Sequence, residues 1–220
     1  MISIAIDGPA GAGKSTLSRQ LAENIDFRYV DTGAIYRTVA VKILKEGIGD
    51  CNPQKVEQLL KSTKLDIDYK DGKQIMILDG EDVTDKIRSE AVSMMASKSS
   101  ALPCVRNFLL EMQREIAKKF NVVMDGRDIG TVVLPNADIK IFLTASPEKR
   151  AKRRFLELQE KGVSADYDTV YNEMLQRDYN DSHRAVAPLV PAKDSVLVDT
   201  SDIGLKESLE LLIKTVKDRM

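Results

Sequence analysis

The sequence is poor in the residue types that bind metals or form covalent cross-links. Its 220 residues include two cysteines, one histidine and no tryptophan. Cys51 and Cys104 are far apart in the sequence and form no CxxC pair, and His183 alone supplies no metal-ligand cluster. These shortages exclude a disulfide framework and a histidine–cysteine metal centre. They make a reducing cytoplasm the simplest expected location.

Long apolar runs and a charge imbalance are also missing. No apolar run approaches the roughly 18 residues of a membrane span. Residues 1–4 enter a strand pattern at once, so we expect a mature start without a signal peptide, and no membrane partner. The formal net charge of −1 argues against a broad nucleic-acid-binding surface.

Short apolar runs alternate with helical patterns along the chain. Such runs are typical of strands buried on both faces of a parallel sheet, and they occupy residues 2–6, 29–30, 122–124, 139–143 and 196–198. The intervening segments carry helical spacing, as in Leu17, Leu21 and Ile25. The alternation predicts an α/β fold with helices flanking a parallel sheet.

Residues 63–80 interrupt this alternation. LDIDYK and KQIMILDG have strand patterns, and Asp71-Gly72 between them is a two-residue turn signal. We therefore expect a small antiparallel insertion.

Residues 8–15, GPAGAGKS, satisfy the phosphate-loop pattern GxxxxGK[ST]. They follow the first predicted strand and precede a helical pattern, which is the context that the motif requires. Glycines let backbone N–H groups turn inward around a polyphosphate, while Lys14 can reach the outer phosphates and Ser15 can bind Mg²⁺. The predicted nucleotide-binding residues are Gly8, Pro9, Ala10, Gly11, Ala12, Gly13, Lys14, Ser15 and Thr16.

A phosphate loop alone fits a GTPase, a motor ATPase or a small-molecule kinase. Thr63-Lys64-Leu65-Asp66 matches the [NT]KxD guanine-reading pattern, but it lies at the edge of the predicted hairpin, and the sequence contains no DxxG switch motif. We therefore set the GTPase reading aside.

Arginines follow several predicted strands, where ligands of α/β sheets bind. A kinase whose acceptor already carries a phosphate must hold two anionic groups together, and this favours planar, permanent cations. Each arginine singly can also be a surface residue. The candidates are Arg37, Arg106, Arg127, Arg177 and Arg184.

Residues 146–162 concentrate basic side chains on one predicted helix, with Arg150, Arg153 and Arg154 near one face. Two interpretations stay open: a solvated or anion-binding helix, and a mobile lid that closes cations over ATP phosphates.

These motifs together resemble bacterial cytidylate kinases, a family of nucleoside monophosphate kinases. The resemblance covers nearly the whole chain and is carried by GPAGAGKST, DTGAIYR, the hairpin insertion, DGRDIGT, the RAKRR helix and HRAVAPLVPA. It implies transfer of the γ-phosphoryl group of ATP, with Mg²⁺, to CMP or dCMP by a monomeric enzyme. The alternatives are a P-loop kinase of another small acceptor and a non-catalytic nucleotide-binding module.

The resemblance also implies roles for individual residues. Thr32, Ser97, Arg106 and Asp128 are expected to read cytosine, Arg37, Arg127 and Arg184 to bind the acceptor phosphate, and Arg177 with Asp181 to contact the sugar. Lys14, Arg127, Arg154 and Arg184 are expected to be catalytic, with Arg150, Arg153 and Arg154 binding ATP. The expected regions are a core (about 1–31, 102–145 and 195–220), an acceptor-binding region (about 32–101) and a lid (about 146–165).

The chemistry of cytosine agrees with these roles. Asp128 can accept from the N4 amino group, whereas the O4 of uracil would face it as a second acceptor. The acceptor phosphate is itself an anionic nucleophile, so no general base is needed, and we expect a surface or loop role for His183. Ser97 can equally be a helix-capping hydroxyl. The role of Asp125 stays open between Mg²⁺ binding, directly or through water, and pairing with an arginine.

Overall fold

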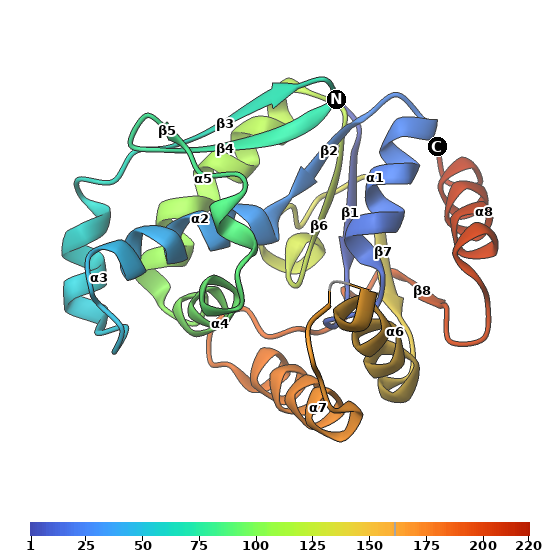
Figure 1. The fold of residues 1–220 in the computed structure, drawn as a ribbon. Coiled ribbons are helices and arrows are strands. Elements are labelled where there is room, and N and C mark those ends of the chain that lie inside the picture. The colour runs from blue at the N-terminus through green and yellow to red at the C-terminus, as the bar shows by residue number, and fades with distance from the viewer. Residues whose placement is uncertain (161) are drawn as a thin grey trace. The chain divides into compact units, whose positions relative to one another are not determined.

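The computed structural model describes residues 1–160 and 162–220, within which the chain forms helices and two β-sheets (Figure 1). The strands are β1 (Ser3–Asp7), β2 (Arg28–Asp31), β3 (Leu65–Lys70), β4 (Lys73–Leu78), β5 (Glu81–Asp82), β6 (Val122–Gly126), β7 (Ile139–Thr144) and β8 (Val196–Asp199). The longer helices are α1 (Lys14–Asn24), α2 (Thr32–Lys45), α3 (Pro53–Leu60), α4 (Glu90–Ser99), α5 (Pro103–Lys119), α6 (Pro147–Glu160), α7 (Tyr167–His183) and α8 (Leu205–Lys217).

The main sheet contains the five strands predicted from apolar runs, in the order β2-β6-β1-β7-β8. The central strand β1 runs parallel to β6 and to β7, and β7 runs parallel to β8. Ile4, Ile6 and Ile141 are almost completely buried, and they form one core cluster with Leu21 of α1 and Leu212 of α8. The predicted α/β fold with a buried parallel sheet is confirmed.

The second sheet is the predicted insertion. β3 and β4 pair antiparallel from Leu65 opposite Leu78 to Lys70 opposite Lys73, and Asp71 and Gly72 form the turn with positive φ. Because the right-handed strand twist favours such two-residue turns, the Asp-Gly signal located the hairpin correctly. The short third strand, β5, was not predicted from the sequence.

The chain divides into two compact units. Residues 1–29 and 121–220 form the first, which contains β1, β6, β7 and β8 with α1, α6, α7 and α8. Residues 30–120 form the second, which contains α2 to α5 and the antiparallel sheet. Among the helices of the described chain, none combines the length and apolar character that a membrane span requires.

Candidate active site

The phosphate loop joins β1 to α1, as its sequence context predicts. Gly8, Gly11 and Gly13 all have positive φ, a conformation that side chains disfavour. A Cβ at Gly8 would lie 1.9 Å from the carbonyl oxygen of Leu143 on β7, so only glycine fits there. Gly13 is the residue that caps α1, and it leaves the first N–H groups of the helix without a side-chain acceptor. This end of α1 therefore suits an anion.

Lys14 is buried among other charges of the first unit. Its Nζ donates to the carbonyl oxygen of Pro9 at 2.7 Å. Burial, followed by the nearby Arg127 and Arg177, lowers the pKa of Lys14, while Asp125 and Asp7 oppose this shift. Cations held this close repel one another, and a bound polyphosphate would relieve that repulsion.

Asp125 is the residue whose role the sequence left open. It is buried at the end of β6, where its Oδ2 accepts a hydrogen bond from Ser15 Oγ at 3.0 Å. Its Oδ1 accepts a second bond from the hydroxyl of Tyr29 at 2.8 Å. The carboxylate is therefore fixed directly beside the hydroxyl that the sequence predicts as a Mg²⁺ ligand. Tyr29 was not expected to take part.

Asp7 was missed by the sequence analysis. It ends β1, is buried, and accepts the backbone N–H groups of Ile129 and Gly130, each at 2.8 Å. Burial raises its pKa to about 6, although these two hydrogen bonds oppose the rise. Ile129–Val133 form a single π-helical turn after β6, so Asp7 ties that turn to the strand that carries the phosphate loop. The only sequence signal was an acid at a strand end.

Two ion pairs, the first partly buried and the second buried, join the loop after β6 to the end of α7. Arg127 Nε donates to Asp181 Oδ2 at 3.0 Å, and Arg184 Nη2 donates to Asp128 Oδ1 at 3.2 Å. All four were predicted as acceptor-binding residues. The structure brings them together in crossed pairs, in which the arginine of each segment binds the aspartate of the other. Arg177 lies on α7 close enough to Lys14 to affect its charge. The side chains of the two ion pairs are thus held in place by each other.

The remaining predicted acceptor residues belong to the second unit. Thr32 is buried at the start of α2, and Ser97 lies half-buried in the last turns of α4, which is capped by Ser89 instead. Arg37 Nη2 donates to Asp31 Oδ2 at 3.0 Å, while no described atom accepts a hydrogen bond from its buried Nε. Arg106 is buried, donates to the carbonyl oxygen of Ser100 and stacks over Tyr36.

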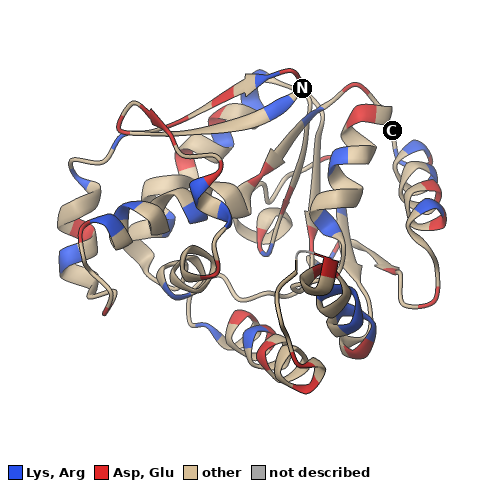
Figure 2. Cartoon of the chain, viewed as in Figure 1, with Lys and Arg blue, Asp and Glu red and all other residues tan. Residues whose placement is uncertain are grey.

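Figure 2 shows the basic residues of α6 grouped together, with acidic residues toward the two ends of the helix, and the three candidate arginines have different surroundings. Arg150 is buried, where it pairs with Asp178 of α7 at 2.6 Å and donates to the carbonyl oxygen of Ala10 in the phosphate loop at 3.0 Å. Arg153 donates to the carbonyl oxygen of Thr200 at 2.6 Å. Arg154 pairs with Glu157 on the exposed surface. Repulsion among the basic charges is therefore reduced by acidic partners.

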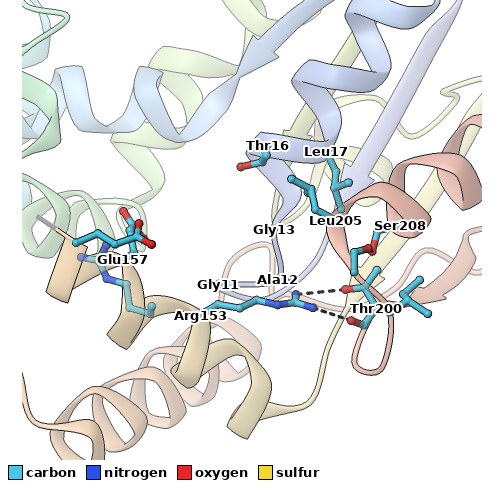
Figure 3. A pocket seen from close by; sticks show the side chains of 14 residues that line it. Gly11, Ala12, Gly13, Thr16, Leu17, Arg153, Glu157, Thr200, Leu205 and Ser208 are labelled. Carbon is cyan, nitrogen blue, oxygen red and sulfur yellow. Dashed lines mark hydrogen bonds and ion pairs between the residues drawn. The ribbon is translucent and has the colours of Figure 1, made fainter.

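A cavity of about 600 Å³ lies beside the phosphate loop within the first unit. Figure 3 shows Arg153 reaching Thr200 across one side of it, with Thr16 and Leu17 of α1 on another. Residues of the loop before α8 and of its first turn, Ile203, Gly204, Leu205 and Ser208, also contribute to the wall. These α8 residues were not predicted, because their contact with the phosphate loop depends on the order of strands in the sheet.

The fold and the site together define the class of the protein. A parallel sheet whose central strand leads through a glycine loop into a helix, with buried cations around that loop, is the architecture of a P-loop phosphate-binding protein.

Comparison with known proteins identifies the family. A sequence model of the cytidylate kinase family matches residues 4–218. The cytidylate kinase of Caldicellulosiruptor bescii is 51% identical over 223 residues, covering 100% of this chain and 99% of that protein. That of Caldicellulosiruptor saccharolyticus is 48% identical over 213 residues, covering 97% and 94%. The chain therefore belongs to the cytidylate kinase family.

Solved structures support the fold. A shikimate kinase from Bacteroides thetaiotaomicron superimposes with a TM-score of 0.52 at 14% identity, covering 98% of each chain. At this identity the likeness concerns the fold alone. It agrees with the P-loop kinase architecture and adds nothing on the acceptor.

Proposed function

We infer that this protein is a (d)CMP kinase, which transfers the γ-phosphoryl group of ATP to CMP or dCMP and releases ADP with CDP or dCDP. An oxygen of the acceptor phosphate attacks the γ-phosphorus, and the bond between that phosphorus and the β,γ-bridging oxygen breaks. The bridging oxygen stays on the β-phosphate, which leaves as part of ADP. The observation that carries the proposal is the crossed pairing of Arg127 with Asp181 and of Arg184 with Asp128, in the unit that holds the phosphate loop. It brings arginines suited to an anion and an aspartate suited to the amino group of a base into one cluster.

ATP is the co-substrate expected of a kinase in this family. We assign its phosphates to the backbone N–H groups of residues 8–16 and to Lys14, whose pKa is lowered first by burial and then by the cations around it. The cavity beside Thr16 and Leu205 is large enough for a nucleoside and adjoins the phosphate loop. Arg154 and Arg153 lie at its wall, which supports their predicted contact with ATP.

Arg150 is also assigned to ATP binding, although in the structure it is bound to partners within the protein. Its guanidinium holds Asp178 and the carbonyl oxygen of Ala10, so it reaches a phosphate only if one of these contacts is exchanged. In this proposal α6 is the lid, as expected for residues 146–165, and its movement would make that exchange.

The acceptor nucleotide is assigned to the residues predicted for it from the sequence. Arg37, Arg127 and Arg184 are proposed to bind its phosphate, and the buried, unpartnered Nε of Arg37 supports an anion there. Asp128, with Thr32, Ser97 and Arg106, is proposed to read cytosine, and Arg177 with Asp181 to contact the sugar. We keep the core, acceptor-binding and lid regions that were predicted from the sequence as part of this proposal.

Catalysis in this proposal depends on charge and position. Lys14, Arg127, Arg154 and Arg184 stabilise the transferring group, and a phosphate oxygen that is ionised at neutral pH needs no general base. His183 stacks on Tyr179 at the exposed end of α7, which agrees with a role outside the chemistry.

Mg²⁺ is proposed as a further requirement. The donor set fits: Ser15 Oγ is 3.0 Å from Asp125 Oδ2, and both are hard oxygen ligands. Over residues 1–160 and 162–220 no group of three or more His, Cys, Asp and Glu side chains could hold a metal ion. Substrate phosphates and water would therefore complete the shell, as is usual for Mg²⁺. When bound, the ion neutralises phosphate charge; Asp125 and Tyr29 orient Ser15 toward it.

The location and the oligomeric state of the protein follow from the same proposal. The substrates CMP, dCMP and ATP favour the cytoplasm and need no nucleic-acid or membrane partner, and we expect the protein to act as a monomer.

A coupled assay of ADP release tests the function directly. It compares CMP, dCMP, UMP, AMP and GMP as acceptors at equal concentration, with ATP and Mg²⁺ in excess. We expect the highest kcat/KM with CMP and dCMP. A preference for UMP or AMP would refute the acceptor assignment, and nucleotide binding without turnover would favour a non-catalytic module.

A further inference from the structure

The side-chain amide of Gln74, on β4, makes two hydrogen bonds to the backbone of Asp31. The Gln74 Oε1 atom accepts the N–H of Asp31 at 2.8 Å, and its Nε2 donates to the carbonyl oxygen of the same residue at 3.2 Å. Both residues belong to the second unit. A primary amide that pairs with an N–H and a C=O of one residue imitates the pairing of a neighbouring strand. The antiparallel insertion therefore fixes Asp31, the residue that caps the start of α2.

Asp31 in turn fixes Arg37. Its Oδ1 accepts the N–H of Ala34 at 2.8 Å and so caps α2, while its Oδ2 binds Arg37 Nη2 at 3.0 Å. The space between them is tight, because a Cβ at Gly33 would lie 3.0 Å from both Asp31 Oδ1 and Arg37 Nη1. With its backbone held by Gln74 and both carboxylate oxygens engaged, Asp31 leaves the guanidinium little freedom to turn.

We propose that Gln74 is a positioning residue for the acceptor phosphate, acting through Asp31 to hold Arg37 in its binding orientation. The inference rests on the proposed function, because Arg37 is assigned there to the phosphate of CMP. Gln74 itself touches no substrate. Because Gln74 lies on the antiparallel insertion, that sheet contributes to binding of the acceptor. It fixes the start of α2 and thereby the orientation of the Arg37 guanidinium.

The effect should fall on CMP and leave ATP binding unaffected. Without the Gln74 amide, the start of α2 and the Asp31 carboxylate become more mobile. Arg37 must then be ordered when CMP binds, and this reduces the affinity for CMP. We expect Gln74→Ala to raise the KM for CMP about 10-fold while the KM for ATP changes less than about 2-fold. Gln74 is half-buried on a surface hairpin, so the thermal midpoint should change little.

A double-mutant cycle separates positioning from a general structural role. Gln74→Ala, Arg37→Ala and the double variant are compared by steady-state kinetics with CMP and with ATP, and Lys73→Ala, the exposed neighbour on the same strand, is the matched control. If Gln74 acts through Arg37, the Gln74 substitution has no further effect on the KM for CMP in the Arg37→Ala background. The control should behave like the unchanged protein.

The outcomes distinguish two kinds of failure. If Arg37→Ala raises the KM for CMP but Gln74→Ala does not, or if the two effects multiply independently, the positioning role is wrong and the function stands. If Arg37→Ala leaves the KM for CMP unchanged, the assignment of Arg37 to the acceptor phosphate is wrong, and the inference built on it falls as well.

Discussion

Replacing Asp7 by asparagine removes a buried negative charge and keeps the shape of the side chain. In the structure that carboxylate accepts the N–H groups of Ile129 and Gly130, and burial raises its pKa from the ordinary 3.8 to about 6. An amide offers one oxygen to two donors, so the variant also loses one hydrogen bond. Removal of the buried charge stabilises the folded protein, whereas loss of the hydrogen bond destabilises it. Only the effect of the charge depends on pH.

The size of the pH-dependent part follows from the two pKa values. Their difference, at about 1.36 kcal/mol per pKa unit, corresponds to about 3 kcal/mol. Because the folded-state pKa of Asp7 lies above the unfolded-state value, its contribution to stability is fully present below pH 3.8 and is lost as the pH rises through about 6. Integrated from pH 5 to pH 8, the loss is about 1.4 kcal/mol.

Urea unfolding of the unchanged protein and of Asp7→Asn at pH 5 and pH 8 measures this quantity. We expect the free energy of unfolding of the unchanged protein, relative to the variant, to fall by about 1.4 kcal/mol between the two pH values. Asp138→Asn is a suitable control, because hydrogen bonds from Ser3 lower the pKa of Asp138 and place its titration below this range. A difference that stays constant between pH 5 and pH 8 would mean that burial does not raise the pKa of Asp7 as described.

The other predictions concern selectivity, catalysis and the loop backbone. Asp128→Asn should lower the ratio of kcat/KM for CMP over UMP by about 10- to 100-fold, because an amide can donate to O4 of uracil; an unchanged ratio would show that Asp128 does not read the base. Lys14→Ala should reduce kcat far more than the affinity for CMP, and equal losses in the two would contradict its assignment to the γ-phosphate. Gly8→Ala places a Cβ 1.9 Å from the Leu143 carbonyl oxygen and should cost about 3 kcal/mol or more of unfolding free energy, whereas Gly13→Ala, with 3.8 Å to its nearest neighbour, should cost about 1 kcal/mol. Equal costs in urea unfolding would refute this explanation.

The strands and the insertion could be predicted because their signals are local. A continuous apolar run such as residues 139–143 indicates a strand buried on both faces, and Asp71-Gly72 supplies the positive φ values that a hairpin turn needs. The π-helical turn at Ile129–Val133 was not foreseen. Its sequence, IGTVV, is rich in β-branched residues that favour strands, and it adopts the turn because Asp7 holds its first N–H groups.

At the site, prediction from the sequence was limited mainly by contacts between residues that are distant in the sequence. The residue types of Arg127, Asp128 and Arg184 indicated phosphate and base recognition, but nothing local showed that each arginine would pair with a particular aspartate. Arg150 illustrates the same point, since its burial against Asp178 depends on how α6 packs on α7. Such pairings arise from topology, which a single sequence does not encode in any short window.

The central position of β1 has a consequence for how the chain folds. Its hydrogen-bonded neighbours begin at Val122 and Ile139, near the middle of the sequence and beyond it. Residues 30–120, by contrast, form a compact unit from one uninterrupted stretch. During synthesis this internal unit can fold before β6 and β7 have been made, while β1 waits for those partners. Until β6 and β7 emerge, an apolar strand with two open edges is exposed, and aggregation of the nascent chain is most probable in that interval.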